Sequence, residues 1–137
     1  MKLGDQMIDS GMDPTDVYNR VKAYLTAHPD TDGILTLGPN SADPVIKLLR
    51  DTNTAGKYKS FITFDLDGDI SKAIKDGIVE SAIDQQPYLQ GYLAVSLLNG
   101  FVNYGLDLPT RPVLTGPGIV DAANVDATMA GATAGAR

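Results

Sequence analysis

The chain contains 137 residues, enough for one domain with a hydrophobic core of its own. Its formal net charge of −6 disfavours nucleic acid and anionic membranes as binding partners, because both are themselves negatively charged. It has no cysteine and a single histidine, His28, so it offers no disulfide, no thiolate nucleophile and too few ligands for zinc. No apolar run approaches the ~20 residues that cross a bilayer.

The first residues of the chain suggest a capped helix rather than a targeting signal. The opening MKLGDQMIDSG is too short and too acidic for a secretory signal, which fits a cytosolic protein, a mature form or a chain that begins inside a longer gene. Residues 5–9 are a weak strand candidate. A helix is expected over 14–27, with Asp13 as its N-cap and Pro14 at its first position. His28 follows it, where a cation stabilises the last helical carbonyls.

The rest of the chain alternates short apolar runs with amphipathic segments. We predict strands at 33–37, 60–64 and 79–84, helices at 41–51, 69–77 and 87–104, an extended segment at 111–120, and a frayed Ala/Gly-rich tail at 130–137. Repeats of strand then helix predict an α/β fold with a parallel sheet that helices cover on both faces.

Polar residues follow each predicted strand. In parallel sheets, ligands sit beyond the carboxyl ends of the strands. The residues expected there are Gly38, Pro39 and Asn40, then Asp65, Leu66 and Asp67, then Asp84, Gln85 and Gln86. They form a ring of polar groups in which we can complete no catalytic base, nucleophile pair or metal cluster.

The stretch FITFDLDGDI is compatible with enzymatic interpretations of Asp65. In a haloacid-dehalogenase-like phosphatase it would be the nucleophile, but that chemistry needs a lysine well downstream and later acidic residues for Mg²⁺. The last lysine here is Lys75, and Asp69 stands where a threonine is expected. A phosphoacceptor receiver domain needs a lysine at the end of the last strand, and SAIDQQP has none.

A calcium-binding loop is the third interpretation of the same stretch. Asp65, Asp67 and Asp69 alternate as in such loops, and Asp76 falls at the twelfth position. The sixth position requires glycine for a sharp turn, and it holds Ile70. The aspartates at 67 and 69 are better explained as caps of the helix that follows.

Three longer stretches resemble the C-terminal lobe of the ribose-binding-like periplasmic sugar-binding proteins, the solute receptors of ABC importers. They are AYLTAHPDTDGILTLGPNSADPVIKLL, ITFDLDGDISKAIKDGIVESAIDQQPYLQGYLAVSLLNG and PVLTGPGIV. Their order and spacing match the family, and the resemblance covers nearly the whole chain.

The resemblance implies a non-enzymatic protein that binds a monosaccharide or similar polyol without a cofactor. Members of the family have two α/β lobes joined by three crossovers, and the lobes close on the sugar. Asp65 corresponds to the aspartate that binds sugar hydroxyls, and Gln85 to the glutamine that ends the following strand. Gly38 stands where the family often has asparagine, and Asn40 is the candidate substitute. The implied location is the periplasm, and the implied membrane partner is the permease of the importer.

The same resemblance predicts that residues 1–137 are one partial domain, the C-terminal lobe. The N-terminal lobe and the first strand and helix of this lobe are expected to be missing, which leaves strand edges and helix faces for the missing lobe or a second copy of the chain. The alternative within this fold is the ligand core of a lactose-repressor-type regulator. Such a regulator would carry an N-terminal helix-turn-helix, whereas a receptor would carry a signal peptide.

Overall fold

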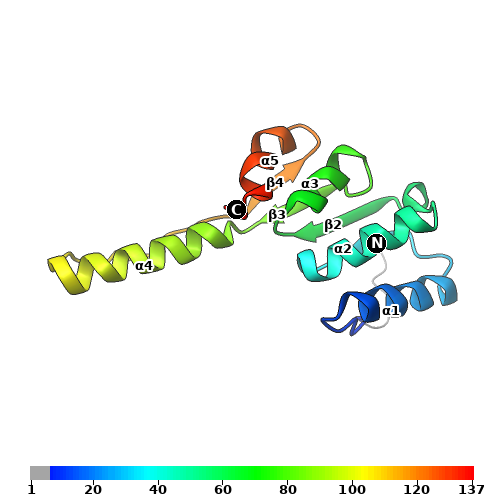
Figure 1. Cartoon of the computed structure of the whole chain (residues 1–137), viewed down its shortest axis with the longest axis horizontal. Coiled ribbons are helices and arrows are strands. Elements are labelled where there is room, and N and C mark those ends of the chain that lie inside the picture. Colours follow the sequence, from blue (N-terminus) through cyan, green and yellow to red (C-terminus); the bar gives the residue numbers. More distant parts are fainter. Residues whose placement is uncertain (1–6) are drawn as a thin grey trace.

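The computed structural model describes residues 7–137 and consists of one small sheet with helices around it (Figure 1). The strands are β1 (Gly33–Leu35), β2 (Ser60–Phe64), β3 (Ser81–Asp84) and β4 (Gly118–Asp121). The α-helices are α1 (Pro14–Ala27), α2 (Pro39–Asp51), α3 (Gly68–Lys75), α4 (Pro87–Tyr104) and α5 (Val125–Thr133). A short 3₁₀ turn, η1 (Ala55–Lys57), precedes β2.

The four strands lie in the order β1-β2-β3-β4. The first three are parallel, with Ile34 opposite Phe61 and Thr63 opposite Ala82, which confirms the α/β class and the parallel pairing. Strand β4 runs antiparallel to β3, so the expectation of an entirely parallel sheet is wrong at this edge. The reason lies in the connection: after α4 the chain returns along that helix as an extended segment, so it enters the sheet from the carboxyl end of β3.

Most element boundaries follow from local chemistry. Helix α1 spans the expected residues, and the Asp13 side chain accepts the backbone N–H groups of Thr15 and Asp16 at 2.9 and 3.1 Å. Helix α2 begins two residues earlier than expected, because Gly38, at φ +139°, breaks the strand direction and proline suits the first helical position.

Further boundaries differ from the expectation: β1 ends at Leu35 instead of residue 37, and α3 spans Gly68–Lys75 instead of 69–77. Strand β3 begins at Ser81, since the N–H groups of Ile78 and Val79 donate to the Ala73 carbonyl and so close α3. The weak strand candidate at 5–9 lies partly outside the described residues, and residues 7–9 form no strand.

The first half of the Ala/Gly-rich tail, residues 130–133, belongs to helix α5, so the expectation of a frayed end is wrong for that part. Helix α5 packs against α3, where the Thr133 side chain lies against Gly68. Its residues Val125, Thr128 and Ala132 are buried. Alanine is the best helix former, and this packing supplies the tertiary contacts that a short helix needs to be stable.

Within residues 7–137, helices cover one face of the sheet only. Phe61, Thr63, Ala82 and Val120 are buried and point to the same side, toward the core that the helices complete. The opposite face carries Leu35, Ile62, Phe64, Ile83 and Ile119, of which Leu35 is 62% exposed. We call these five residues the open face. For the part of the chain that the structure describes, the expectation that helices cover both faces is therefore wrong, because α4 does not fold back over the sheet.

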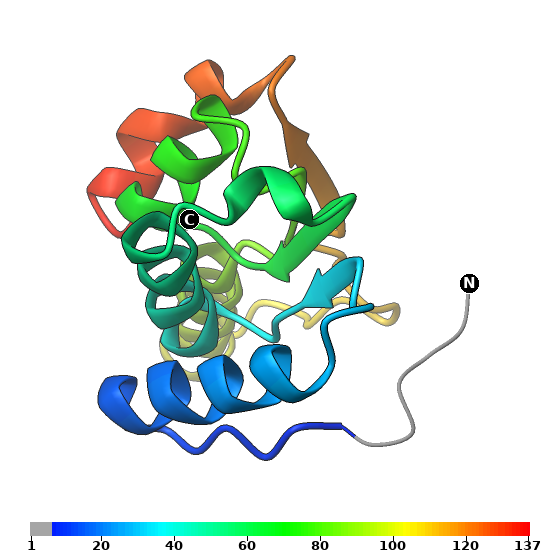
Figure 2. The same ribbon diagram turned by 90° about the vertical axis from the view of Figure 1, so that its right-hand side faces the viewer.

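Helix α4 projects away from the sheet as an arm (Figure 1) and makes no extensive contact with another helix or strand. The two views differ by a quarter turn, and in both α1, α2, α3 and α5 lie close to the sheet while α4 projects away from it (Figure 2). The arm carries no charged side chain, and most of its large apolar residues are exposed: Tyr88, Tyr92, Val95, Leu98, Phe101, Val102 and Tyr104. Even so, within the described part of the chain no helix combines the length and hydropathy needed to cross a bilayer.

Candidate functional site

The residues singled out in the sequence follow the carboxyl ends of β1, β2 and β3, so they lie at one edge of the sheet. Gly38 is buried and is the N-cap of α2, while Asn40 is exposed in the first turn of that helix. Asp65 is half-buried and Gln85 is exposed. This is the arrangement expected for all four residues, whose role in binding a ligand stays a prediction.

Asp65 and Gln85 are in direct contact. The Asp65 carboxylate oxygen Oδ1 accepts the backbone N–H of Gln85 at 3.1 Å. Asp65 adopts a left-handed backbone conformation, φ +56°, which few non-glycine residues adopt. One carboxylate oxygen thus anchors the neighbouring strand end, and the other, Oδ2, is not used by that bond. The pair is suited to hydroxyl groups, because a carboxylate only accepts hydrogen bonds whereas an amide both donates and accepts them.

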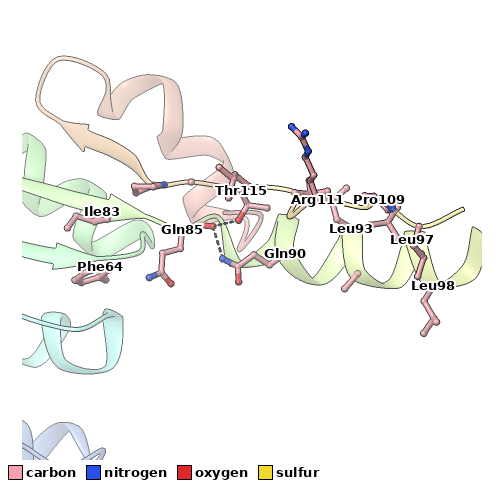
Figure 3. A pocket seen from close by; sticks show the side chains of 16 residues that line it. Phe64, Ile83, Gln85, Gln90, Leu93, Leu97, Leu98, Pro109, Arg111 and Thr115 are labelled. Atoms are coloured by element: carbon pink, nitrogen blue, oxygen red, sulfur yellow. Dashed lines mark hydrogen bonds between the residues drawn. The ribbon is translucent and has the colours of Figure 1, made fainter.

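The backbone of Gln85 is held from two further directions (Figure 3). Its carbonyl accepts the Thr115 hydroxyl at 2.9 Å and the Gln90 side-chain amide at 2.9 Å. The Gln86 side chain in turn donates to the Thr115 carbonyl. In Figure 3 the Gln85 side-chain amide points away from Thr115, so its polar atoms remain available while its backbone is fixed.

A mainly apolar groove begins at this point and runs between α4 and the returning segment 108–117. Its volume is about 980 Å³. Phe64 and Ile83 of the open face line one end, Leu93 and Leu97 line the side that the arm forms, and Leu114 lines the side of the returning segment. Gln85 and Thr115 also line the groove, which therefore joins the polar strand ends to an apolar surface.

Asp84, the residue before Gln85, holds this part of the chain from inside the protein. It is fully buried, and its Oδ2 accepts Nε and Nη2 of Arg137 at 2.9 and 2.6 Å. Its other oxygen accepts the backbone N–H of Gln86 at 2.9 Å. Asp84 is thus part of the scaffold and is inaccessible to a ligand.

Acidic side chains gather where α2 and α3 begin. The Asp67 side chain caps α3 by accepting the Ile70 N–H at 2.8 Å, and Asp69 lies exposed in the first turn. Asp43 of α2 is half-buried, and its Oδ1 has no hydrogen-bonding partner. Burial, and then the nearby charge of Asp67, raise the pKa of Asp43 from 3.8 to about 7, with a smaller contribution from the charge of Asp69.

The hydrogen bonds of Asp65 and Asp67 are relevant to the calcium-loop and phosphatase interpretations of this stretch. The carboxylates of Asp65 and Asp67 each accept a backbone N–H, as strand-end and helix-capping groups do. Among residues 7–137, no three His, Asp or Glu side chains are grouped so that they could hold a metal ion.

Several residues around the site were not singled out from the sequence. Thr115 and Gln90 carry no motif, and their contact with Gln85 depends on the returning segment lying beside α4. Arg137 lies in a tail that we expected to be frayed. Asp43 had a weak signal, since it is an acidic residue beside the apolar positions Ala42 and Val45 of the same helix.

An open α/β sheet with Asp65 and Gln85 in contact at its carboxyl edge is the architecture of a lobe of the solute-receptor class. A family model described as a periplasmic binding protein domain matches residues 1–105, and the chain belongs to this family, which binds solutes. The chain is 31% identical over 91 residues to the xylose/arabinose-binding protein XylF of Sulfolobus acidocaldarius, covering 64% of this chain and 23% of that protein.

Solved structures show the same relationship. A carbohydrate transporter from Acidothermus cellulolyticus 11B, solved with myo-inositol, is 35% identical with a TM-score of 0.79; the match covers 91% of this chain and 43% of that one. A solute-binding protein from Burkholderia graminis with D-arabinose is 27% identical with a TM-score of 0.73, over 84% of this chain and 40% of that one. A protein described as a LacI transcriptional regulator, from Bacteroides fragilis, has the same fold at 20% identity, with a TM-score of 0.71 over 80% of this chain and 37% of that one. The chain therefore spans less than half the length of these relatives.

Proposed function

We propose that residues 1–137 form the C-terminal lobe of a non-enzymatic sugar receptor of an ABC importer, which binds a monosaccharide or similar polyol. The observation that carries this proposal is the contact between Asp65 and Gln85 at the carboxyl edge of the sheet. It brings a carboxylate, and a residue whose side chain is a primary amide, to the same edge of the sheet. Hydrogen bonds of sugar hydroxyls to a charged group contribute about 1.5–3 kcal/mol each, and two or three of them supply much of a micromolar affinity.

The relatives support this ligand class. The proteins at 27–35% identity are described with xylose and arabinose, with myo-inositol and with D-arabinose, all of which are small polyols. Gly38 and Asn40 complete the proposed site at the end of β1. Gly38 offers no side chain, so the exposed Asn40 is the candidate donor and acceptor there.

The α4 arm supports the two-lobed architecture. The chain leaves the sheet at 85–87 and comes back at 115–117, so both ends of the arm lie at the proposed site. An uncharged helix with exposed aromatic and aliphatic side chains requires an apolar surface to cover it. We assign α4 to the surface of the N-terminal lobe of a longer protein. Segments 85–87 and 115–117, which we call the two crossings, would then act as hinge strands when the lobes close.

The regulator and phosphatase alternatives have less support. The likeness to the LacI-type protein concerns the fold alone, whereas the relatives of higher identity are transport and sugar-binding proteins. As a receptor, the protein would act in the periplasm and hand its sugar to the importer's permease, without a cofactor or nucleic acid as partner.

The test is a sugar titration followed by the backbone amide resonances of the chain. We expect myo-inositol, D-xylose or D-arabinose to shift the amides of Asp65 and Gln85 with a millimolar dissociation constant. The affinity is weak because the second half of the site lies on the other lobe, and each 1.4 kcal/mol lost is about tenfold. The substitution Asp65→Asn should weaken binding by at least about tenfold.

The matched control is Asp30→Asn, which makes the same change of charge in the turn before β1, at the opposite end of that strand. It should leave the titration unchanged. If none of the three sugars moves the Asp65 and Gln85 amides, or if Asp65→Asn binds as well as the unsubstituted chain, the proposed function is wrong.

A further inference from the structure

We propose that Arg137 is a positioning residue for the sugar site: it fixes the Asp84 carboxylate, and Asp84 holds the strand end that presents Gln85. The part of this inference that concerns affinity rests on the proposed function. The part that concerns the strand end does not.

The contact between Arg137 and Asp84 has the geometry of a fixed pair. Two nitrogens of the guanidinium, Nε and Nη2, converge on Oδ2 at 2.9 and 2.6 Å. The Asp84 side chain is 0% exposed, whereas the Arg137 side chain is 28% exposed. A buried carboxylate without a partner is strongly unfavourable, so the position of Asp84 depends on this cation. A planar guanidinium also fixes the direction of the carboxylate better than a single ammonium does.

Asp84 in turn fixes the backbone of the residues that follow it. Its Oδ1 accepts the Gln86 N–H at 2.9 Å, and Gln86 adopts a left-handed conformation, φ +55°, that starts α4. Such a conformation is uncommon for glutamine and persists only where neighbouring contacts hold it. The Asp65 carboxylate and the fixed Gln86 therefore hold the backbone of Gln85 from both sides.

Segment 115–117, where the chain returns to the sheet, contacts Gln85 and Gln86 as well. The Gln86 side chain donates to the Thr115 carbonyl, and the Thr115 hydroxyl donates to the Gln85 carbonyl. A Cβ atom on Gly116 would lie 2.7 Å from the Asp84 carbonyl oxygen, so the two crossings are in van der Waals contact there. Asp84 is therefore at the base of both proposed hinge strands, and Arg137 supplies its counter-charge.

The fold brings Arg137 to this place through α5. The N–H of Ala136 donates to the Gly131 carbonyl at 2.8 Å, which turns the chain after the helix. The Arg137 side chain then crosses Gly131, where a Cβ atom would lie 3.1 Å from its Cγ. Because α5 packs on α3, the guanidinium is held by the same helices that cover the sheet.

The experiment compares Arg137→Ala and Arg137→Lys with the unsubstituted chain by amide hydrogen exchange and by titration with D-arabinose. We expect Arg137→Ala to speed exchange at Gln86 by at least about tenfold relative to amides inside β2, and to weaken sugar binding about tenfold. Arg137→Lys should give an intermediate result in both measurements, because it keeps the charge and loses the paired nitrogens. The control is Arg20→Ala, which removes an exposed contact with Asp16. It should change neither the exchange rate at Gln86 nor the affinity for D-arabinose.

Each outcome decides the inference. Equal exchange at Gln86 in the alanine variant, together with unchanged affinity, would show that Arg137 contributes to stability alone. If the alanine variant does not fold, the lysine variant decides by the same two measurements, and behaviour identical to the unsubstituted chain overturns the inference. If the unsubstituted chain binds no sugar, the proposed function fails, while the exchange at Gln86 still tests the positioning role.

Discussion

At the scale of the residue, Asp43 makes the stability of the folded chain depend on pH. Burial and the nearby Asp67 raise its pKa from 3.8 to about 7, so the folded chain binds a proton that the unfolded chain releases. The free energy of unfolding should therefore fall as pH rises from about 4 to 7, and stay level above that. A shift of this size corresponds to about 4 kcal/mol in full, and screening at a half-buried site reduces it to the order of 1–2 kcal/mol.

The substitution that tests this sign is Asp43→Asn, which keeps the shape and cannot ionise. Denaturant unfolding should show the variant more stable than the unsubstituted chain at pH 8 and nearly equal to it at pH 4. The comparison variant is Asp30→Asn, an exposed carboxylate for which we expect the same difference at both pH values. Parallel curves for Asp43→Asn and the unsubstituted chain would contradict the assignment.

At the scale of the element, the base of the α4 arm depends on close contact between its two crossings. Replacing Gly116 with alanine places a methyl group 2.7 Å from the backbone oxygen of Asp84, so one crossing must move. We expect Gly116→Ala to destabilise the chain by about 1–3 kcal/mol, measured by thermal unfolding, because backbone cannot yield as a side-chain tip does.

The control for this prediction lies on the same arm. Gly91 is inside α4 and a Cβ atom there meets nothing within 4 Å. Gly91→Ala should leave stability unchanged or raise it by about 0.5–1 kcal/mol, since glycine is unfavourable inside a helix. A neutral Gly116→Ala would mean that the crossings can separate at no cost.

At the scale of the whole molecule, two apolar surfaces lack a cover in the described chain: the open face of the sheet and the α4 arm. Residues of this kind are usually covered by protein, so the isolated chain should self-associate at micromolar concentration. The double substitution Leu98→Gln and Val102→Gln removes two exposed side chains, 59% and 67% accessible, from the arm. Sedimentation velocity should show a shift toward monomer, without loss of the helical circular dichroism signal.

The matched surface control is Met12→Gln, since Met12 is 75% exposed before α1 and far along the chain from the arm. It should sediment like the unsubstituted chain. A monodisperse monomer for the unsubstituted chain would show that the two apolar surfaces are tolerated in water.

The sequence by itself determined the elements whose signals are local. Asp13 and Pro14 start α1, Pro87 and Gly105 bound α4, and the apolar run at 60–64 forms β2. Each of these signals acts within a few residues through caps, backbone preferences and side-chain alternation. The same reasoning placed Asp65 and Gln85 at one edge, because parallel strands end on the same side of a sheet.

Only the tertiary structure decided the rest, because it depends on segments distant in the sequence. The direction of β4 follows from the path of the chain along α4, and α5 is stable because α3 covers it. The pairing of Asp84 with Arg137 joins positions 53 residues apart, and the pKa of Asp43 depends on a helix end that lies beside it only after folding. Burial and charge proximity are properties of the packed chain, and no local pattern in the sequence encodes them.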